Sequence, residues 1–204
     1  MTIGVRLVQE GRRLAESLDS IRFERPVEFV YNPLDYARDP YEQYLLRYGN
    51  SKKQVLFLGM NPGPWGMAQT GVPFGEIDAV SRWMGIIGVV NRPRREHARR
   101  PVDGFSCERS EVSGRRLWGL MRNRYGSADR FFSDQLVVNY CPLLFLEESG
   151  RNRTPDKLPK KERDVLTSLC DRHLAAIVKI VRPTWFVGVG AFAASRLREI
   201  VDLK

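Results

Sequence analysis

The stretch that most constrains this chain is a short apolar run that leads straight into a turn rich in proline and glycine. Residues 55–58 read V-L-F-L, a run of strand-forming residues typical of a strand buried on both faces. Residues 59–64 read G-M-N-P-G-P, and their two prolines and two glycines exclude both a helix and further strand pairing. The chain must therefore turn here, with its backbone passing close to a neighbour. Asn61 stands at this turn, beyond the carboxyl end of the expected strand, where open α/β sheets bind their ligands.

The loop that follows this turn holds an aromatic side chain. Phe74 stands between Pro73 and Gly75, so its ring is a candidate stacking platform on a rigid loop. Spacing alone leaves a second interpretation equally open, in which Asn61 merely caps a tight turn and Phe74 belongs to the core. Other segments have to decide between the two.

The pattern along the chain predicts an α/β fold. Apolar runs predict strands over 135–140 and 185–190 and a short one over 29–31, and Asn139 lies at the end of its strand as Asn61 does. Helical periodicity predicts helices over 2–21, 41–48, 76–87, 113–124 (capped by Ser113), 160–181 and 191–203. Strands that alternate with helices predict a parallel sheet with right-handed crossovers. No repeat or linker interrupts the pattern, so we expect one domain over residues 1–204.

The chain carries an excess of positive charge. Its 33 Lys and Arg against 24 Asp and Glu give a net charge of +9, which favours phosphate-rich partners. The most basic segment, residues 92–100, reads R-P-R-R-E-H-A-R-R. Such a loop is consistent with solvated surface or with phosphate contacts, and charge alone does not separate the two.

Several classes of protein are disfavoured by what the sequence lacks. Its three cysteines are dispersed without a C-x-x-C pair, which argues against a disulfide scaffold, a zinc site and an iron–sulfur cluster. No signal peptide and no apolar run of about 18 residues occurs, so we expect an intracellular soluble protein without membrane contact. A nucleotide- or phosphate-binding α/β protein is a weak alternative, because neither G-x-x-x-x-G-K-[ST] nor G-x-G-x-x-G follows a strand.

Five segments together resemble one enzyme family, the single-strand-selective monofunctional uracil-DNA glycosylases. They are residues 59–76, 31–37, 110–114, 141–146 and 149–152, and the likeness extends from about Phe29 to about Leu197. The resemblance implies a three-layer α/β/α fold around a short central parallel sheet. It also implies hydrolytic excision of uracil, and of 5-modified uracils such as 5-hydroxymethyluracil, from single- and double-stranded DNA in base excision repair.

The resemblance further implies the conditions under which the enzyme works. The target nucleotide leaves the base stack and enters a pocket, and the reaction leaves an abasic site. Neither a metal nor an organic cofactor is expected. No lysine occurs in the matching motifs, which is consistent with a water nucleophile rather than a Schiff base. We expect a monomer that acts on DNA in the nucleoid or the nucleus.

Roles for individual residues also follow from the resemblance. Asn61 would orient the attacking water, since an amide cannot act as an ionised base near neutral pH. Asn139 would donate to O4 and accept from N3–H of uracil, and Phe74 would stack on the base. Gly63 and Met67 would form a wall that leaves room for a 5-substituent. The expected phosphate contacts are Arg94, Arg95, Arg151 and Arg153.

One part of the family pattern is missing. The family carries a later His-Pro-Ser-Pro segment, whose histidine stabilises the departing base anion and whose following loop wedges into the duplex. Neither His97, in the arginine-rich loop, nor His173, expected at the surface or at the boundary of a helix, lies in a matching motif. We therefore expect the last strand and the wedge loop to be absent from this chain. The alternative function is a catalytically weak DNA-binding protein that recognises uracil or abasic sites.

Overall fold

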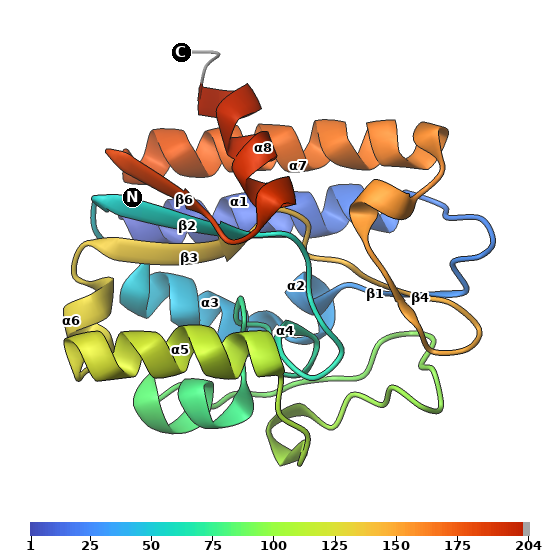
Figure 1. The fold of residues 1–204 in the computed structure, drawn as a ribbon, viewed down its shortest axis with the longest axis horizontal. Coiled ribbons are helices and arrows are strands. Elements are labelled where there is room, and N and C mark those ends of the chain that lie inside the picture. The colour runs from blue at the N-terminus through green and yellow to red at the C-terminus, as the bar shows by residue number, and fades with distance from the viewer. Residues whose placement is uncertain (202–204) are drawn as a thin grey trace.

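A parallel sheet of three short strands organises the fold. The computed structural model describes residues 1–201, in which β2 (Val55–Gly59) lies between β3 (Gln135–Asn139) and β6 (Trp185–Gly188). Both neighbours run parallel to β2, and the register places Gly59 opposite Asn139. The carboxyl ends of all three strands therefore meet at one edge of the sheet (Figure 1). This is the edge at which parallel α/β sheets bind ligands.

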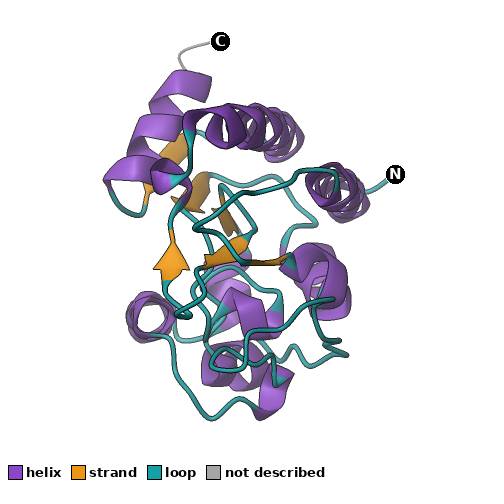
Figure 2. Ribbon diagram, turned by 90° about the vertical axis from the view of Figure 1, so that its right-hand side faces the viewer, coloured by secondary structure: helices purple, strands orange, loops and turns teal. Residues whose placement is uncertain are grey.

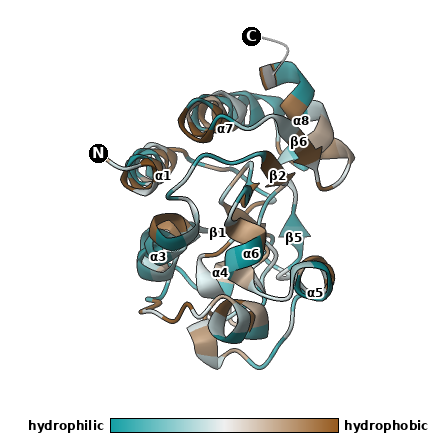
Figure 3. Cartoon of the chain, turned by 90° about the vertical axis from the view of Figure 1, so that its left-hand side faces the viewer, coloured by the Kyte–Doolittle hydropathy of each residue, from teal (hydrophilic) through white to brown (hydrophobic). Residues whose placement is uncertain are grey.

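Helices cover both faces of this sheet and confirm the predicted three-layer arrangement. Figures 1 and 2 show α7 (Lys160–Val181) and α8 (Ala191–Val201) on one side and α3 (Arg38–Tyr48) and α5 (Val112–Tyr125) on the other. The first helix, α1 (Ile3–Asp19), packs against both α7 and α3. Hydrophobic residues gather on one side of α1 and of α7 (Figure 3), and those of α1 include the buried Leu7, Leu14 and Leu18.

A second sheet, antiparallel, was not predicted. In it β4 (Leu144–Leu146) pairs with β1 (Phe29–Tyr31) and with β5 (Asn152–Arg153). The prediction treated residues 29–31 as a strand but gave them no partner, because the partner lies more than a hundred residues away. This sheet fixes the segment that leaves β3, and so it supports the edge at which Asn139 lies.

The helix predicted over residues 76–87 is present only in part. Helical structure extends over residues 77–83, of which Ala79–Trp83 is a π-helical turn, and it does not continue to residue 87. The carbonyl oxygen of Met84 accepts hydrogen bonds from the side chains of Tyr48 (2.8 Å) and Arg47 (2.9 Å), and Gly85 has a φ of +62°. Side chains of α3 therefore donate to the Met84 carbonyl oxygen in place of a backbone N–H of a continuing helix. The left-handed conformation of Gly85 then ends the helical turn.

The other elements are short. They are the helices α2 (Pro33–Tyr36), α4 (Met67–Thr70) and α6 (Ala128–Phe132), and the 3-10 turns Gly104–Ser106 and Pro155–Lys157. The predicted helix over 191–203 corresponds to α8, and its last two positions lie outside the described residues. None of the helices within residues 1–201 is long and apolar enough to cross a membrane. Over the same residues, no group of three or more His, Cys, Asp or Glu side chains could hold a metal ion.

Candidate active site

Two segments that are 80 residues apart meet at the carboxyl edge of the central sheet. Gly59 ends β2 opposite Asn139, and the ring of Phe74 lies against both. A Cβ atom on Gly59 would lie 2.5 Å from the Phe74 ring and would collide with Oδ1 of Asn139. Only glycine allows this approach, so the glycine that the sequence places before the turn brings the Asn139 amide and the Phe74 ring together.

The predicted pocket residues line one cavity of about 210 Å³. Asn61, Gly63, Met67, Phe74 and Asn139 all contribute to its wall. The sequence prediction missed other residues of the same wall, which are Met60, Pro62, Glu111, Ser113 and Val189. The structure thus brings together every residue for which the resemblance implied a role in water or base binding.

The amide group of Asn61 is held on its nitrogen side. Nδ2 donates to the carbonyl oxygens of Leu143 (3.3 Å) and Pro62 (3.4 Å). Asn152 donates to the same Pro62 oxygen at 3.3 Å, which fixes the turn from the second sheet. With its nitrogen engaged, Asn61 offers Oδ1 as a hydrogen-bond acceptor. The sequence prediction did not identify Asn152 as a support, although its segment belongs to the matching motifs.

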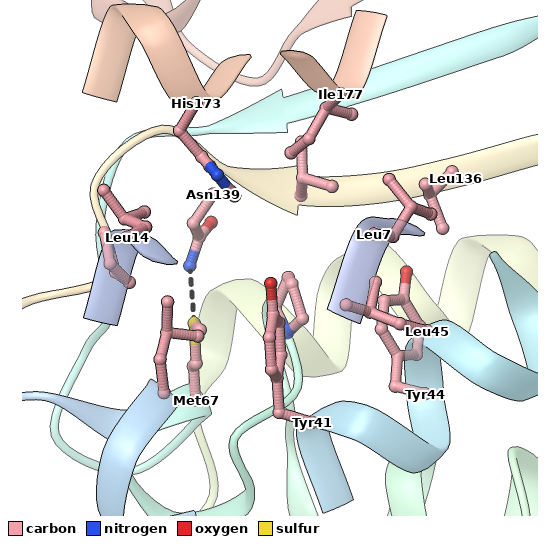
Figure 4. Close-up of a pocket in the computed structure, with 14 residues that line it drawn as sticks. Leu7, Leu14, Tyr41, Tyr44, Leu45, Met67, Leu136, Asn139, His173 and Ile177 are labelled. Carbon is pink, nitrogen blue, oxygen red and sulfur yellow. Dashed lines mark hydrogen bonds between the residues drawn. The ribbon is translucent and has the colours of Figure 1, made fainter. Parts of the chain in front are cut away.

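The amide group of Asn139 is only partly satisfied. Its Nδ2 lies 3.2 Å from the sulfur of Met67, as the dashed line in Figure 4 marks. Its Oδ1 is buried and has no hydrogen-bond partner within the described part of the chain. A buried amide oxygen without a partner costs about 1–3 kcal/mol, so this atom is prepared to accept a hydrogen bond from a ligand.

Phe74 is held in an unusual backbone conformation. Its φ is +54°, a region that phenylalanine rarely adopts. Trp118 of α5 donates its indole N–H to the Phe74 carbonyl at 2.9 Å, and a Cβ on Gly114 would collide with that same oxygen. Helix α5 therefore fixes the loop, and the strain at Phe74 is balanced by a buried contact. The predicted helix over residues 113–124 did not identify Trp118 as a support of this loop.

The start of α5 differs from the prediction. Ser113 does not cap the helix; it donates its hydroxyl group to Oε1 of Glu111 at 2.6 Å. Glu111 occupies the N-cap position, and burial raises the pKa of its carboxyl group, against the opposing effect of the Ser113 hydrogen bond. A carboxyl group in this wall was not predicted, because nothing local in the sequence distinguishes Glu111 from a surface residue.

Comparison with known proteins agrees with this geometry. The family model described as the uracil DNA glycosylase superfamily matches residues 46–203. The chain belongs to the uracil-DNA glycosylase superfamily. Over 192 residues, or 94% of its length, it is 50% identical to the single-strand selective monofunctional uracil DNA glycosylases of Mus musculus and Bos taurus, and covers 69% and 71% of them. These relatives confirm the resemblance found in the motifs.

A solved structure supports the fold of this glycosylase. The crystal structure of wild-type SMUG2 from Pedobacter heparinus superposes with a TM-score of 0.62. The match covers 100% of this chain and 95% of that one. Because only 15% of the residues are identical, this likeness concerns the fold alone.

The arginines predicted to contact phosphates do not line the pocket of this glycosylase. Three of them pair with carboxylates: Arg94 with Asp19 (3.5 Å), Arg95 with Glu28 (3.0 Å) and Arg153 with Glu147 (2.8 Å). The fourth, Arg151, is exposed. Pairing reduces the net charge that these positions offer to a phosphate.

A different cationic cluster adjoins the active-site loop. Trp65 follows the Pro-Gly turn, and the guanidinium groups of Arg100 and Arg109 lie 5.3 Å and 4.7 Å from the centre of its rings. Arg109 is also two residues from Glu111 of the pocket wall. Sequence analysis missed this cluster, because its members are 35 and 44 residues from Trp65 along the chain.

Neither histidine of the described chain lines the pocket that holds Asn61 and Phe74. His97 lies in the loop, as predicted, but is buried, and its Nε2 is 2.9 Å from the carbonyl oxygen of Glu148. The prediction that His173 lies at a surface or boundary is wrong, since it is 8% exposed. Its side chain lines a small separate cavity behind Asn139, with Leu14 and Tyr41 (Figure 4). Burial lowers the pKa of His173 to about 4.

Proposed function

We propose that this glycosylase removes uracil from DNA by hydrolysis of the bond between base and deoxyribose. The observation that carries the proposal is the half-satisfied amide of Asn139, buried beside the Phe74 ring. Uracil presents an N–H donor at N3 next to a carbonyl acceptor at O4, which matches the Oδ1 and Nδ2 of an asparagine. Cytosine presents the opposite order, which would leave buried groups unpaired at about 1–3 kcal/mol each.

The depth of the pocket supports extrusion of the target nucleotide. Asn139 is partly buried at the end of β3, and Phe74 lies on a loop that α5 holds through Trp118. A base that remains stacked in a duplex cannot reach either group, so the nucleotide has to leave the stack first. Single-stranded DNA requires less unstacking, and double-stranded DNA remains within reach at a higher cost.

In this proposal Asn61 holds the water. Its Nδ2 is occupied by two carbonyl oxygens, so Oδ1 accepts a hydrogen bond from the water molecule that attacks the sugar. An amide contributes orientation rather than proton abstraction, which suits a reaction in which the base departs early. The histidine expected to stabilise the departing anion stays a prediction, since neither His97 nor His173 lines the pocket.

The partner in this proposal is DNA. The net charge of +9 and the Trp65–Arg100–Arg109 cluster beside the pocket favour a phosphate backbone that passes the active-site loop. Gly63 and Met67 stand in the wall that a 5-substituent would face, so 5-modified uracils are proposed substrates. We expect the protein to act as a monomer on nuclear or nucleoid DNA.

A second function is favoured by one observation. Because neither histidine within residues 1–201 lines the pocket, the chain could bind uracil-containing or abasic DNA with little catalysis. Single-turnover cleavage of a strand with one uracil, with alkali to reveal the abasic site, separates the two functions when binding is measured in parallel. We expect cleavage at uracil and none at cytosine in the same position. Tight binding without cleavage would establish the second function instead.

A further inference from the structure

One acidic side chain in the pocket wall has no role in the function proposed above. Glu111 lines the same cavity as Asn61 and Phe74. Its Oε1 accepts the hydroxyl of Ser113 at 2.6 Å, whereas its Oε2 is buried and finds no partner within residues 1–201. An unpaired carboxylate oxygen in a buried site is costly, more so than a neutral one. The pocket therefore holds a strong acceptor that still lacks a donor.

The carboxylate lies against two glycines of the active-site loop. A Cβ on Gly63 would come within 2.8 Å of Oε1, and a Cβ on Gly66 would collide with Oε2. Gly66 directly precedes Met67. The carboxylate thus fills the space that side chains at these two positions would need, and it lines the same pocket as Met67.

The hydrogen bonds of Asn139 show which edge of a bound base would face this wall. One hydrogen of Nδ2 is available for O4, and the other points to the sulfur of Met67 at 3.2 Å. In a pyrimidine ring, C5 adjoins C4 on the side away from N3. A base whose N3–H and O4 pair with Asn139 therefore turns C5 toward Met67, which lines the pocket together with Glu111.

A hydrogen-bond acceptor near C5 could distinguish between bases that differ only in their 5-substituent. Thymine is 5-methyluracil and is a normal base of DNA, whereas 5-hydroxymethyluracil carries a larger substituent at the same carbon. A pocket that admits the larger group cannot exclude the methyl group by size, so polarity has to discriminate. A site built to hydrogen-bond a hydroxyl rejects the analogue that lacks it much more strongly than a hydrophobic wall could.

We propose that Glu111 determines specificity at C5: its free Oε2 accepts a hydrogen bond from a donor on the 5-substituent of an extruded pyrimidine, as in 5-hydroxymethyluracil. The proposal rests on the function proposed above, because it places the base by its contacts with Asn139. Glu111 would form a favourable hydrogen bond with a hydroxymethyl group. It would form an unfavourable contact with a methyl group, which has no donor, and with an anionic substituent, which it repels.

The first test compares two substrates in one variant. Glu111→Met removes the acceptor and nearly preserves the volume beside Gly63 and Gly66. Single-turnover rates are measured on strands that carry uracil or 5-hydroxymethyluracil at the same position. We expect the ratio of the 5-hydroxymethyluracil rate to the uracil rate to fall at least tenfold, with uracil excision kept within a few-fold. Glu108→Met, at an exposed carboxylate three residues away, is the matched control and should leave the ratio unchanged.

The second test looks for an increase in the excision rate of a substrate that Glu111 should disfavour. A 5-carboxyuracil substituent is an anion and should be repelled by Glu111, so Glu111→Gln should raise the ratio of its rate to the uracil rate. Equal losses on all substrates would show that Glu111 acts on the water or the fold, and an unchanged ratio in both variants would also overturn the proposal. A wild-type chain that binds DNA but cleaves no uracil would refute the proposed function, and this inference with it.

Discussion

At the scale of single residues, the two asparagines of the site are prepared in opposite ways. Asn61 has its nitrogen fixed by two carbonyl oxygens and offers an oxygen. Asn139 has its nitrogen on a weak sulfur acceptor and its oxygen unpaired. The first arrangement suits a water molecule, which needs one acceptor, and the second suits a base edge that brings both a donor and an acceptor.

Asn61→Ala should therefore separate catalysis from binding. We expect the single-turnover rate on uracil to fall by roughly a hundredfold, which corresponds to about 2.7 kcal/mol of barrier, because the water loses its orientation. DNA affinity should stay nearly constant, since the side chain is not a ground-state contact to DNA. Asn123→Ala, on the exposed side of α5, is the control. A parallel loss of affinity would mean that Asn61 holds the loop rather than the water.

Gly63→Ala tests the pocket wall. The added methyl group would lie 2.8 Å from Oε1 of Glu111, so it must displace the carboxylate or narrow the pocket on its C5 side. Excision of 5-hydroxymethyluracil should fall more than excision of uracil when both are measured under single-turnover conditions. If both rates fall by the same factor, Gly63 serves only the backbone turn.

At the scale of elements, the prediction succeeded where local sequence determines an element and failed where long-range contacts determine it. The run V-L-F-L and the turn after it specify β2 and the position of Asn61 with little outside help, because a continuous apolar run and Pro/Gly placement are local signals. The segment 76–87 has an equally clear helical pattern but forms only part of that helix. The carbonyl oxygen of its Met84 accepts a hydrogen bond from the Tyr48 hydroxyl, a partner that local sequence does not reveal.

Two long-range contacts of the site could not be predicted from local sequence for the same reason. Trp118 orients the Phe74 carbonyl across 44 residues, and Glu111 meets Gly63 across 48. Each residue has an ordinary local explanation, as a core aromatic or as a surface acid. Only the packing of α5 under the active-site loop brings both residues to the site, so the sequence predicted five residues of the pocket wall but neither of these long-range contacts.

Helices α1 and α7 carry a built-in acid sensitivity. His173 of α7 has a pKa of about 4 in the folded protein, below the ordinary value of 6.5 for an unfolded chain, because burial disfavours its charged form. The neutral histidine therefore contributes stability above pH 6.5, and this contribution is lost as the pH falls from 6.5 through 4. The difference amounts to about 3 kcal/mol.

His173→Leu should remove this contribution. Between pH 7 and pH 4, the free energy of unfolding of the wild-type protein should fall by about 3 kcal/mol more than that of the variant. Urea denaturation at a series of pH values measures both curves, and the carboxylates common to both proteins cancel in the comparison. Parallel curves would show that His173 does not titrate as its burial implies.

At the scale of the whole molecule, the arginines differ in whether a nearby carboxylate already neutralises their charge. Arg94, Arg95 and Arg153 are each paired with an acid, whereas Arg109 stacks on Trp65 at the edge of the pocket. A basic stretch in a sequence indicates how much charge is present but not how much of it is already neutralised. Of the basic segment 92–100, Arg100 at its end also lies against Trp65 beside the pocket.

The salt dependence of DNA binding can locate the phosphate contacts. Affinity for a single strand should fall steeply with salt concentration, and Arg109→Ala should reduce the slope of log K against log salt by about 1. The double variant Arg94→Ala with Arg95→Ala should change the slope less, because both side chains face carboxylates. A larger change in the double variant would place the strand along the arginine-rich loop.

The contact between Asn139 and Met67 has a consequence for the pocket under oxidising conditions. A thioether is a poor hydrogen-bond acceptor, so the empty pocket keeps the Asn139 nitrogen in place without competing strongly with a substrate carbonyl. Oxidation would turn Met67 into a sulfoxide, whose oxygen is a strong acceptor. The amide would then bind its own neighbour in preference to a base. Oxidation of this one sulfur atom should therefore weaken the binding of a base by Asn139.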